Sequence, residues 1–84
     1  MRFARLSSPP LDVGWLNDGN SIVVACKDGK LRIIDPDSME MLEEISAIDG
    51  IAYCLMVLPK GKVAVGGLSG QLTLQTPRSG RGGK

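Results

Sequence analysis

Two hairpin signals recur in this sequence, and the glycines at their centres, Gly29 and Gly70, lie 41 positions apart. Each signal is a turn dipeptide, Asp28-Gly29 or Ser69-Gly70, between runs rich in Val, Ile and Leu. An Asp-Gly pair between such runs is typical of a tight β-hairpin, because glycine accepts the positive φ that the turn requires. The strands expected beside the turns are residues 21–27 and 30–35 in the first copy, and 62–68 and 71–75 in the second.

The similarity between the two copies extends beyond their turns. At an offset of 41, apolar residues align in pairs, namely Ile22 with Val63, Val24 with Val65, Leu31 with Leu72 and Ile33 with Leu74. The same offset aligns Val13 with Cys54 and Trp15 with Met56. A repeat of about 40–45 residues that contains several strands is the signature of a β-propeller blade. We therefore predict an all-β fold of antiparallel, four-stranded blades.

The chain supplies about two blades' worth of strands. Residues 11–46 form the first unit, with four strands expected at 11–16, 21–27, 30–35 and 39–45. Residues 47–77 form a second, incomplete unit, with three strands expected at 51–58, 62–68 and 71–75. Residues 1–10 form an N-terminal arm, in which residues 2–6 offer a spare strand that can complete a blade. A closed propeller takes about 4–8 blades, so we expect a fragment of a longer propeller, an oligomerising subunit, or a completing piece of another protein's propeller.

Two of the expected strands carry further signals. Residues 39–45 are rich in Met, Leu and Glu, which favour a helix that Ser38 can cap, whereas the repeat favours a strand. Residues 51–58 form a continuous apolar run, which is typical of a strand buried on both faces. Cys26 and Cys54 both lie inside apolar runs and are predicted to be buried free thiols.

The first hairpin carries a family resemblance. Residues 21–35 resemble the second and third strands of a WD-repeat blade, and Ile34-Asp35 stands where that family has Trp-Asp. Continued to Ile45, the stretch also resembles blades of quinoprotein-like and surface-layer-like propellers. The resemblance covers residues 11–77. The second unit has Gln75-Thr76 in place of Trp-Asp, and the chain has no His, so the Gly-His element of the WD-repeat family is missing.

The resemblance implies a non-enzymatic module for protein–protein interaction, or a scaffold. In the family resembled, the loops between the second and third strands and between blades line a face that grips peptides. On this chain the matching residues, which form the predicted partner-binding site, are Lys27, Asp28, Lys30, Asp49 and Ser69. The expected partners are other proteins or further copies of the chain.

The sequence carries no set of residues suited to catalysis or metal binding. Without His, a Ser-His-Asp or Cys-His site cannot form within the chain, and two cysteines 28 residues apart do not have a zinc spacing. We therefore predict no enzyme activity, no metal site, no cofactor and no small-molecule substrate. The sequence has neither the apolar core of a signal peptide nor the roughly 20 apolar residues of a membrane helix, so the expected location is cytoplasmic or nuclear.

Charge is divided unevenly along the chain. Residues 11–49 hold all nine acidic residues and three basic ones, whereas residues 50–84 hold five basic residues and no acid. This asymmetry favours head-to-tail association or an oppositely charged partner. The Gly/Arg-rich tail, residues 78–84, is predicted to be disordered. Its cations support an alternative function, weak binding of nucleic acid through phosphate contacts, with the residues Arg78, Arg81 and Lys84.

Overall fold

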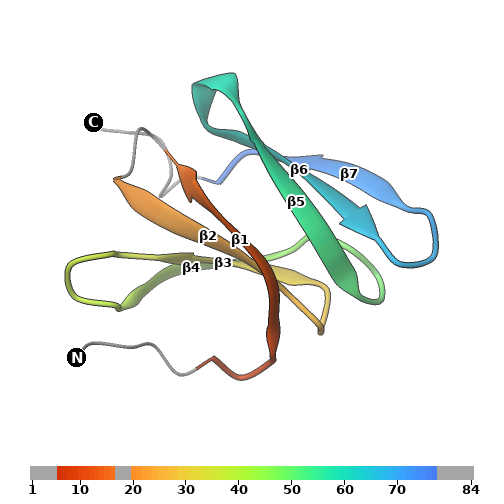
Figure 1. The fold of residues 1–84 in the computed structure, drawn as a ribbon, viewed down its shortest axis with the longest axis horizontal. Coiled ribbons are helices and arrows are strands. Elements are labelled where there is room, and N and C mark those ends of the chain that lie inside the picture. Colours follow the sequence, from red (N-terminus) through yellow and green to blue (C-terminus); the bar gives the residue numbers. More distant parts are fainter. Residues whose placement is uncertain (1–5, 17–19, 78–84) are drawn as a thin grey trace.

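The structure is a computed structural model that describes residues 6–16 and 20–77. Within these residues the chain forms seven strands in two antiparallel sheets (Figure 1). The first sheet contains β1 (Pro10–Leu16), β2 (Ser21–Cys26), β3 (Lys30–Ile34) and β4 (Met41–Ser46). The second contains β5 (Ala52–Leu58), β6 (Lys62–Gly67) and β7 (Leu72–Gln75), and a short 3-10 helix, η2 (Pro59–Gly61), joins β5 to β6.

Both sheets are simple meanders, in which each strand pairs with the one that follows it in the chain. The predicted all-β fold is therefore confirmed, with four antiparallel strands in one sheet and three in the other. Among the described residues neither sheet closes on itself, and the two sheets pack against each other as neighbouring blades do (Figure 1).

The pairing of strands confirms the repeat within the two hairpins. Val24 of β2 pairs with Arg32 of β3, and Val65 of β6 pairs with Thr73 of β7. Equivalent residues of the two hairpins are thus 41 positions apart in both strands. The turn signals of the sequence therefore fix the register of each hairpin correctly.

The same offset is wrong for the first strand of each sheet. Val13 of β1 pairs with Val24, whereas Leu55 of β5 pairs with Val65. Val13 is therefore equivalent to Leu55 and not to Cys54, which is an offset of 42. The cause is one extra residue in the connection from β1 to β2, compared with that from β5 to β6. The corrected pairs are Val13 with Leu55, Gly14 with Met56 and Trp15 with Val57.

The structure resolves the choice between helix and strand at residues 39–45 in favour of a strand. This strand, β4, pairs with β3 and begins at Met41. It starts later than predicted because a turn precedes it. In that turn the Oδ1 atom of Asp35 accepts a hydrogen bond of 2.8 Å from the backbone N–H of Asp37, and Met39 adopts a positive φ of 61°.

One hydrophobic core lies between the two sheets. Its buried members come from both sheets and from the β4–β5 connection, and they are Leu16, Val23, Ala25, Leu31, Ile33, Ala47, Ile48, Ala52, Val63 and Val65. β1 and β5 approach closely beside this core, because a Cβ atom on Gly14 would lie only 3.0 Å from Val57 Cγ2. The carboxylate of Asp12 on β1 accepts a hydrogen bond of 3.0 Å from the backbone N–H of Leu55. Apolar packing and this hydrogen bond hold the sheets together.

Each sheet buries only one of its faces in this core. The prediction that residues 51–58 are buried on both faces is wrong, because Tyr53, Cys54 and Met56 are exposed. Side chains alternate between the two faces of a strand, and only one face of the second sheet meets the first. Of the two cysteines predicted to be buried free thiols, Cys26 is buried, whereas the prediction is wrong for Cys54.

One-sided packing predicts unequal effects at equivalent positions of the two hairpins. Leu31 is fully buried, whereas its equivalent Leu72 is 77% exposed. We expect Leu31→Ala to lower the free energy of unfolding by about 2–5 kcal/mol, because it opens a cavity in the core. The matched change Leu72→Ala should cost less than about 0.5 kcal/mol in dilute solution. Urea unfolding followed by circular dichroism measures both values, and equal losses would contradict the one-sided packing.

Candidate functional site

Three loops meet at one end of the strands. Successive turns of an antiparallel meander alternate between the two ends of a sheet, so the β2–β3 turn, the β4–β5 connection and the β6–β7 turn share one end. We call residues 27–30, 47–51 and 68–70 the loop edge. It contains every residue of the predicted partner-binding site.

Backbone hydrogen bonds join the three parts of the loop edge. The carbonyl oxygen of Gly29 accepts hydrogen bonds from the N–H groups of Ala47, at 3.0 Å, and Ile48, at 2.9 Å. The N–H group of Leu68 donates to the carbonyl oxygen of Ile51 at 3.3 Å. The β4–β5 connection is therefore tied to a turn on each side of it, and the three loops form one continuous surface.

Gly29 sits at the tightest point of the loop edge. Its φ is +87°, a conformation that side chains other than that of glycine rarely adopt. A Cβ atom at this position would also overlap the carbonyl oxygens of Ile48 and Gly50. Position 29 therefore requires glycine both for the turn and for the close approach of the β4–β5 connection.

An open pocket of about 450 Å³ lies on the loop edge. Its walls are formed by residues 28–30 on one side and residues 46–50 on the other. The pocket lies beside the backbone hydrogen bonds that join Gly29 to Ala47 and Ile48. Such a surface suits an extended peptide that presents polar groups.

The structure brings three of the five predicted partner-binding residues to this pocket, namely Asp28, Lys30 and Asp49. Lys27 lies beside the pocket in the β2–β3 turn, and Ser69 lies in the β6–β7 turn. Both side chains are exposed, and neither lines the pocket. The loop edge thus presents charges of both signs around the pocket.

Arg32 of β3 is an ion-pair partner of Asp28 in the loop edge, a role that the sequence analysis did not predict. Its side chain is only 2% exposed, and its Nη2 atom lies 2.8 Å from a carboxylate oxygen of Asp28 and 2.8 Å from one of Glu44. Its Nη1 atom donates a second hydrogen bond of 3.1 Å to Asp28. A buried cation is stable only when it is paired and hydrogen-bonded, and here two carboxylates surround it. The available signal was a single arginine inside an apolar strand, four residues after an aspartate.

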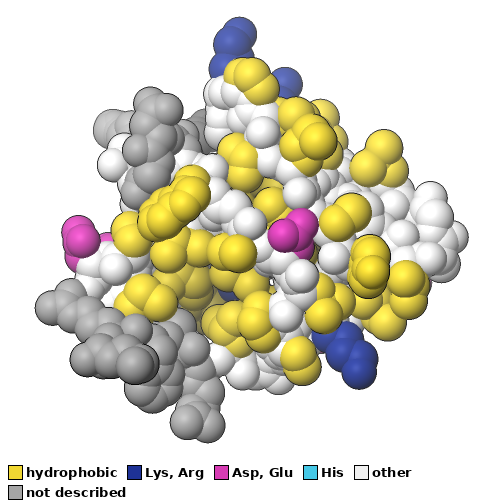
Figure 2. Space-filling model, in the orientation of Figure 1, with side chains coloured by type: hydrophobic (Ala, Val, Ile, Leu, Met, Phe, Trp, Pro, Cys, Tyr) yellow, Lys and Arg dark blue, Asp and Glu magenta, His cyan; other side chains and the backbone are white. Residues whose placement is uncertain are grey.

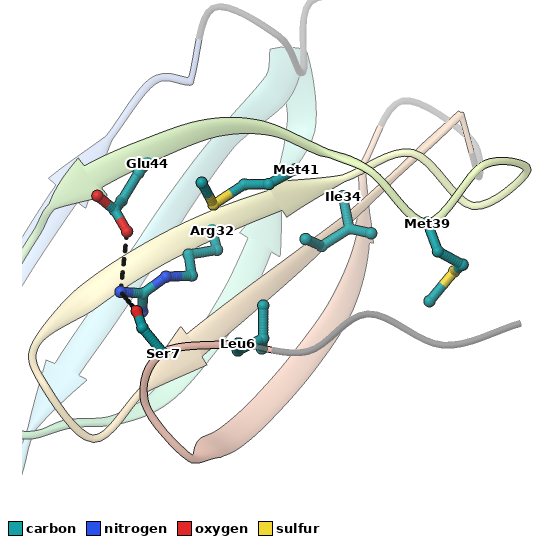
Figure 3. Close-up of a pocket in the computed structure, with 7 residues that line it drawn as sticks. All are labelled: Leu6, Ser7, Arg32, Ile34, Met39, Met41 and Glu44. Carbon is teal, nitrogen blue, oxygen red and sulfur yellow. Dashed lines mark hydrogen bonds and ion pairs between the residues drawn. The ribbon is translucent and has the colours of Figure 1, made fainter.

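Arg32 also fixes the residues that precede β1. Its Nη2 atom donates a hydrogen bond of 2.9 Å to Ser7 Oγ, and the backbone N–H of Asp28 donates one of 2.9 Å to Ser8 Oγ. Figure 3 shows Arg32 reaching between Ser7 and Glu44. Because three side chains already engage its guanidinium, Arg32 acts as a structural anchor. The apolar side chains around the adjoining cavity of about 230 Å³ are Leu6, Ile34, Met39 and Met41.

The electrostatics of the turn separate structural charges from exposed ones. The hydrogen bond from Arg32 holds the pKa of the Asp28 carboxyl below its ordinary value, and the backbone N–H of Lys30 acts in the same direction. The carboxylate of Asp28 therefore stabilises the fold through its ion pair with Arg32. Lys27 and Asp49 are exposed charges that a partner can meet, and Lys30, whose Nζ atom lies 3.7 Å from Glu44, also keeps 39% of its side chain exposed.

Several sequence predictions cannot be located on this structure. Residues 78–84, with Arg78, Arg81 and Lys84, and residues 2–5 of the spare strand lie outside the described part of the chain. Within the described residues, no cluster of three or more His, Cys, Asp or Glu side chains is arranged to hold a metal ion. The described residues also contain no helix that is long and apolar enough to span a membrane.

Comparison with known proteins places the chain among β-propeller sequences. The family model described as the anaphase-promoting complex subunit 4 WD40 domain matches residues 11–57, which is more than half of the chain. Coronin-A of Dictyostelium discoideum is 33% identical to the chain over 55 residues. This match covers 66% of the chain but only 12% of coronin-A, so the chain spans a small part of that relative's length.

Replacement of Gly29 by alanine should destabilise the protein more than the same change at Gly70. Both glycines have a positive φ, but a Cβ atom at Gly70 would meet nothing within 4 Å. We expect Gly70→Ala to cost about 1–2 kcal/mol of unfolding free energy from backbone strain, and Gly29→Ala to cost more because of the added overlap. Urea midpoints measure the difference. Equal losses would show that the β4–β5 connection does not pack tightly on Gly29.

Asp28→Asn should change how stability depends on pH. Because the pKa of Asp28 lies lower in the folded than in the unfolded state, where it is about 3.9, its stabilisation is complete above about pH 5 and is lost as the pH falls through the folded value. We expect the variant to lose about 1–2 kcal/mol of unfolding free energy at pH 7 and to approach the wild type in acid. Urea unfolding between neutral and acidic pH tests this, with exposed Asp49→Asn as control. A constant difference at all pH values would exclude the assigned role.

Proposed function

The chain belongs to the WD40-repeat family, as the resemblance of its first hairpin indicated, and we propose that it is a non-enzymatic module for protein–protein interaction. The loop edge is the surface that we assign to the partner. The observation that carries this assignment is that backbone hydrogen bonds join the three loops and that two of these loops line one open pocket. Cytoplasmic or nuclear location, as expected from the sequence, agrees with such a role.

The chemistry of the loop edge favours a polar, extended peptide. Lys27 and Asp49 place opposite charges at exposed positions near the pocket. The backbone around Gly29 is already held by hydrogen bonds to Ala47 and Ile48, so ordering it on binding costs little conformational entropy and a few contacts suffice for affinity. Specificity then comes from charge complementarity, since exposed charges steer and orient a partner.

The described sheets correspond to one four-stranded blade and one incomplete, three-stranded blade, which do not close a propeller. Three arrangements satisfy the proposed function: two blades within a longer propeller, a subunit that assembles with copies of itself, or a piece that completes another protein's propeller. In each arrangement the loop edge lies at one rim of the ring, where the loops of neighbouring blades adjoin it.

A charge exchange on the loop edge tests the proposed function. Peptides selected from a random displayed library against the full chain provide ligands, and titration calorimetry measures their affinity. The double variant Lys27→Glu, Asp49→Lys should weaken the selected peptides about tenfold or more, because it inverts both exposed charges. The control is Lys60→Glu, in the β5–β6 connection at the opposite end of the strands, which should leave affinity unchanged. Selected peptides that depend on Lys60 and ignore the double variant would place binding elsewhere.

A further inference from the structure

The outer face of each sheet carries apolar side chains that no sheet in the described part of the chain covers. On the first sheet, the apolar side chains of β1 and β2 that point away from the core form what we call the leading face, which comprises Val13, Trp15, Ile22 and Val24. Its β1 part is exposed, whereas Val24 is buried in a small second cluster against which Ile22, Leu6 and Met39 pack. On the second sheet, the corresponding trailing face comprises Ala64, Gly66, Leu72 and Leu74. Trp15 is 59% exposed, and Leu74 is 57% exposed. Figure 2 shows hydrophobic side chains across much of one side of the molecule.

The trailing face is equivalent, one repeat later, to the face that the first sheet buries. Its equivalents in the first sheet are all fully buried in the core, and they are Val23, Ala25, Leu31 and Ile33. The second sheet therefore exposes the very positions that the first sheet uses to pack against its neighbour. Apolar residues at these positions are stabilised when another sheet buries them. The first sheet has such a neighbour, and the second sheet has none within the described residues.

The leading face has the same relation to the second sheet. Its equivalents there all lie in or against the core, and they are Leu55, Val57, Val63 and Val65. Inside the molecule, the face of the first sheet that is equivalent to the trailing face packs on the face of the second sheet that is equivalent to the leading face. The leading face and the trailing face are therefore equivalent to the two sides of the interface that already exists between the two sheets, and each can pack on the other.

Charge supports the same pairing. Residues 11–49, which contain the first sheet, hold nine acids and three bases, whereas residues 50–77 hold two lysines, Lys60 and Lys62, and no acid. Contact between the first sheet of one chain and the second sheet of another brings opposite net charges together. Contact between two copies of the same sheet brings like charges together, which costs free energy.

We infer that the trailing face of this chain binds the leading face of a second copy, in a head-to-tail contact that repeats the packing between its own two sheets. The contact is heterologous, so it forms a closed ring when successive rotations add up to a full turn. Rings of two to four copies would contain the roughly 4–8 blades of a propeller. The inference rests on the proposed function, because the ring is one of the arrangements that present the loop edge.

Two face variants test the contact. Trp15→Glu places a charge on the leading face and Leu74→Glu places one on the trailing face, both at exposed positions that the fold of a single chain tolerates. Sedimentation of the full-length wild-type chain should show association with rising concentration. Each variant alone should weaken association about tenfold or more, because each blocks one half of every contact.

Mixing the two variants distinguishes head-to-tail contact from other modes. Trp15→Glu keeps an intact trailing face, and Leu74→Glu keeps an intact leading face, so their mixture should form a one-to-one heterodimer and nothing larger. If like faces met instead, mixing would rescue no contact. A mixture that stays monomeric, while the wild type associates, would overturn the inference.

Control measurements test whether the variants are folded and whether the loss of association is specific to the two faces. Leu68→Glu changes another exposed leucine, in the β6–β7 turn and beyond the paired strands, and it should associate like the wild type. Circular dichroism should show the same strand content in all variants. Cys54 lies on the exposed side of β5, so its alkylation should slow as chains associate, and it should stay fast in Leu74→Glu.

The outcomes also separate this inference from the proposed function. A wild-type chain that remains monomeric at every concentration, with Cys54 always reactive, would overturn the inference and leave the loop edge untouched. Loss of peptide binding in the Lys27→Glu, Asp49→Lys variant with association retained would support both. Association without any peptide binding at the loop edge would support the head-to-tail contact and contradict the assigned function.

Discussion

The structure depends on the packing of one apolar sheet face against another. Each sheet of this chain carries apolar side chains on both faces, but the fold brings only one face of each into the shared core. Hydrophobic burial supplies most of the stabilisation in a domain of this size, so the interface between the sheets decides whether the chain folds. It also decides what remains outside, because β1 and β5 cannot bury their second faces without a further sheet. The loop edge and the open faces are both consequences of that arrangement.

Local signals in the sequence predicted most of the fold. The Asp28-Gly29 and Ser69-Gly70 turns fixed two hairpin registers correctly, because turn chemistry acts over a few residues. The repeat also predicted β4 as a strand, against the helix propensity of its residues. The register of β1 escaped prediction, since one additional residue in a connection shifts a whole strand without changing its apolar pattern. The exposure of Cys54 also escaped, because an apolar run shows that burial is favourable but not that a partner surface is present.

The candidate site was predicted in part for the same reason. The positions of Lys27, Lys30 and Asp49 followed from the loops in which they lie, and the structure places Lys30 and Asp49 at one pocket and Lys27 beside it. The ion pairs of Arg32 join the β2–β3 turn to β4, and its hydrogen bond to Ser7 reaches the residues before β1. Contacts between such distant segments leave little trace in one sequence. Those contacts divide the charges of the edge into a structural set and an exposed set. A function in recognition rests on the exposed set, held in place by the structural one.

We infer that the leading face and the trailing face of this chain are each covered by another copy. Trp15 is the only tryptophan of the chain and lies on the leading face, so its fluorescence reports on that face alone. As the concentration of the full chain rises, we predict a blue shift of its emission and a loss of quenching by acrylamide, in step with the increase in mass. An emission that stays at the exposed value, equally quenched at every concentration, would contradict the account.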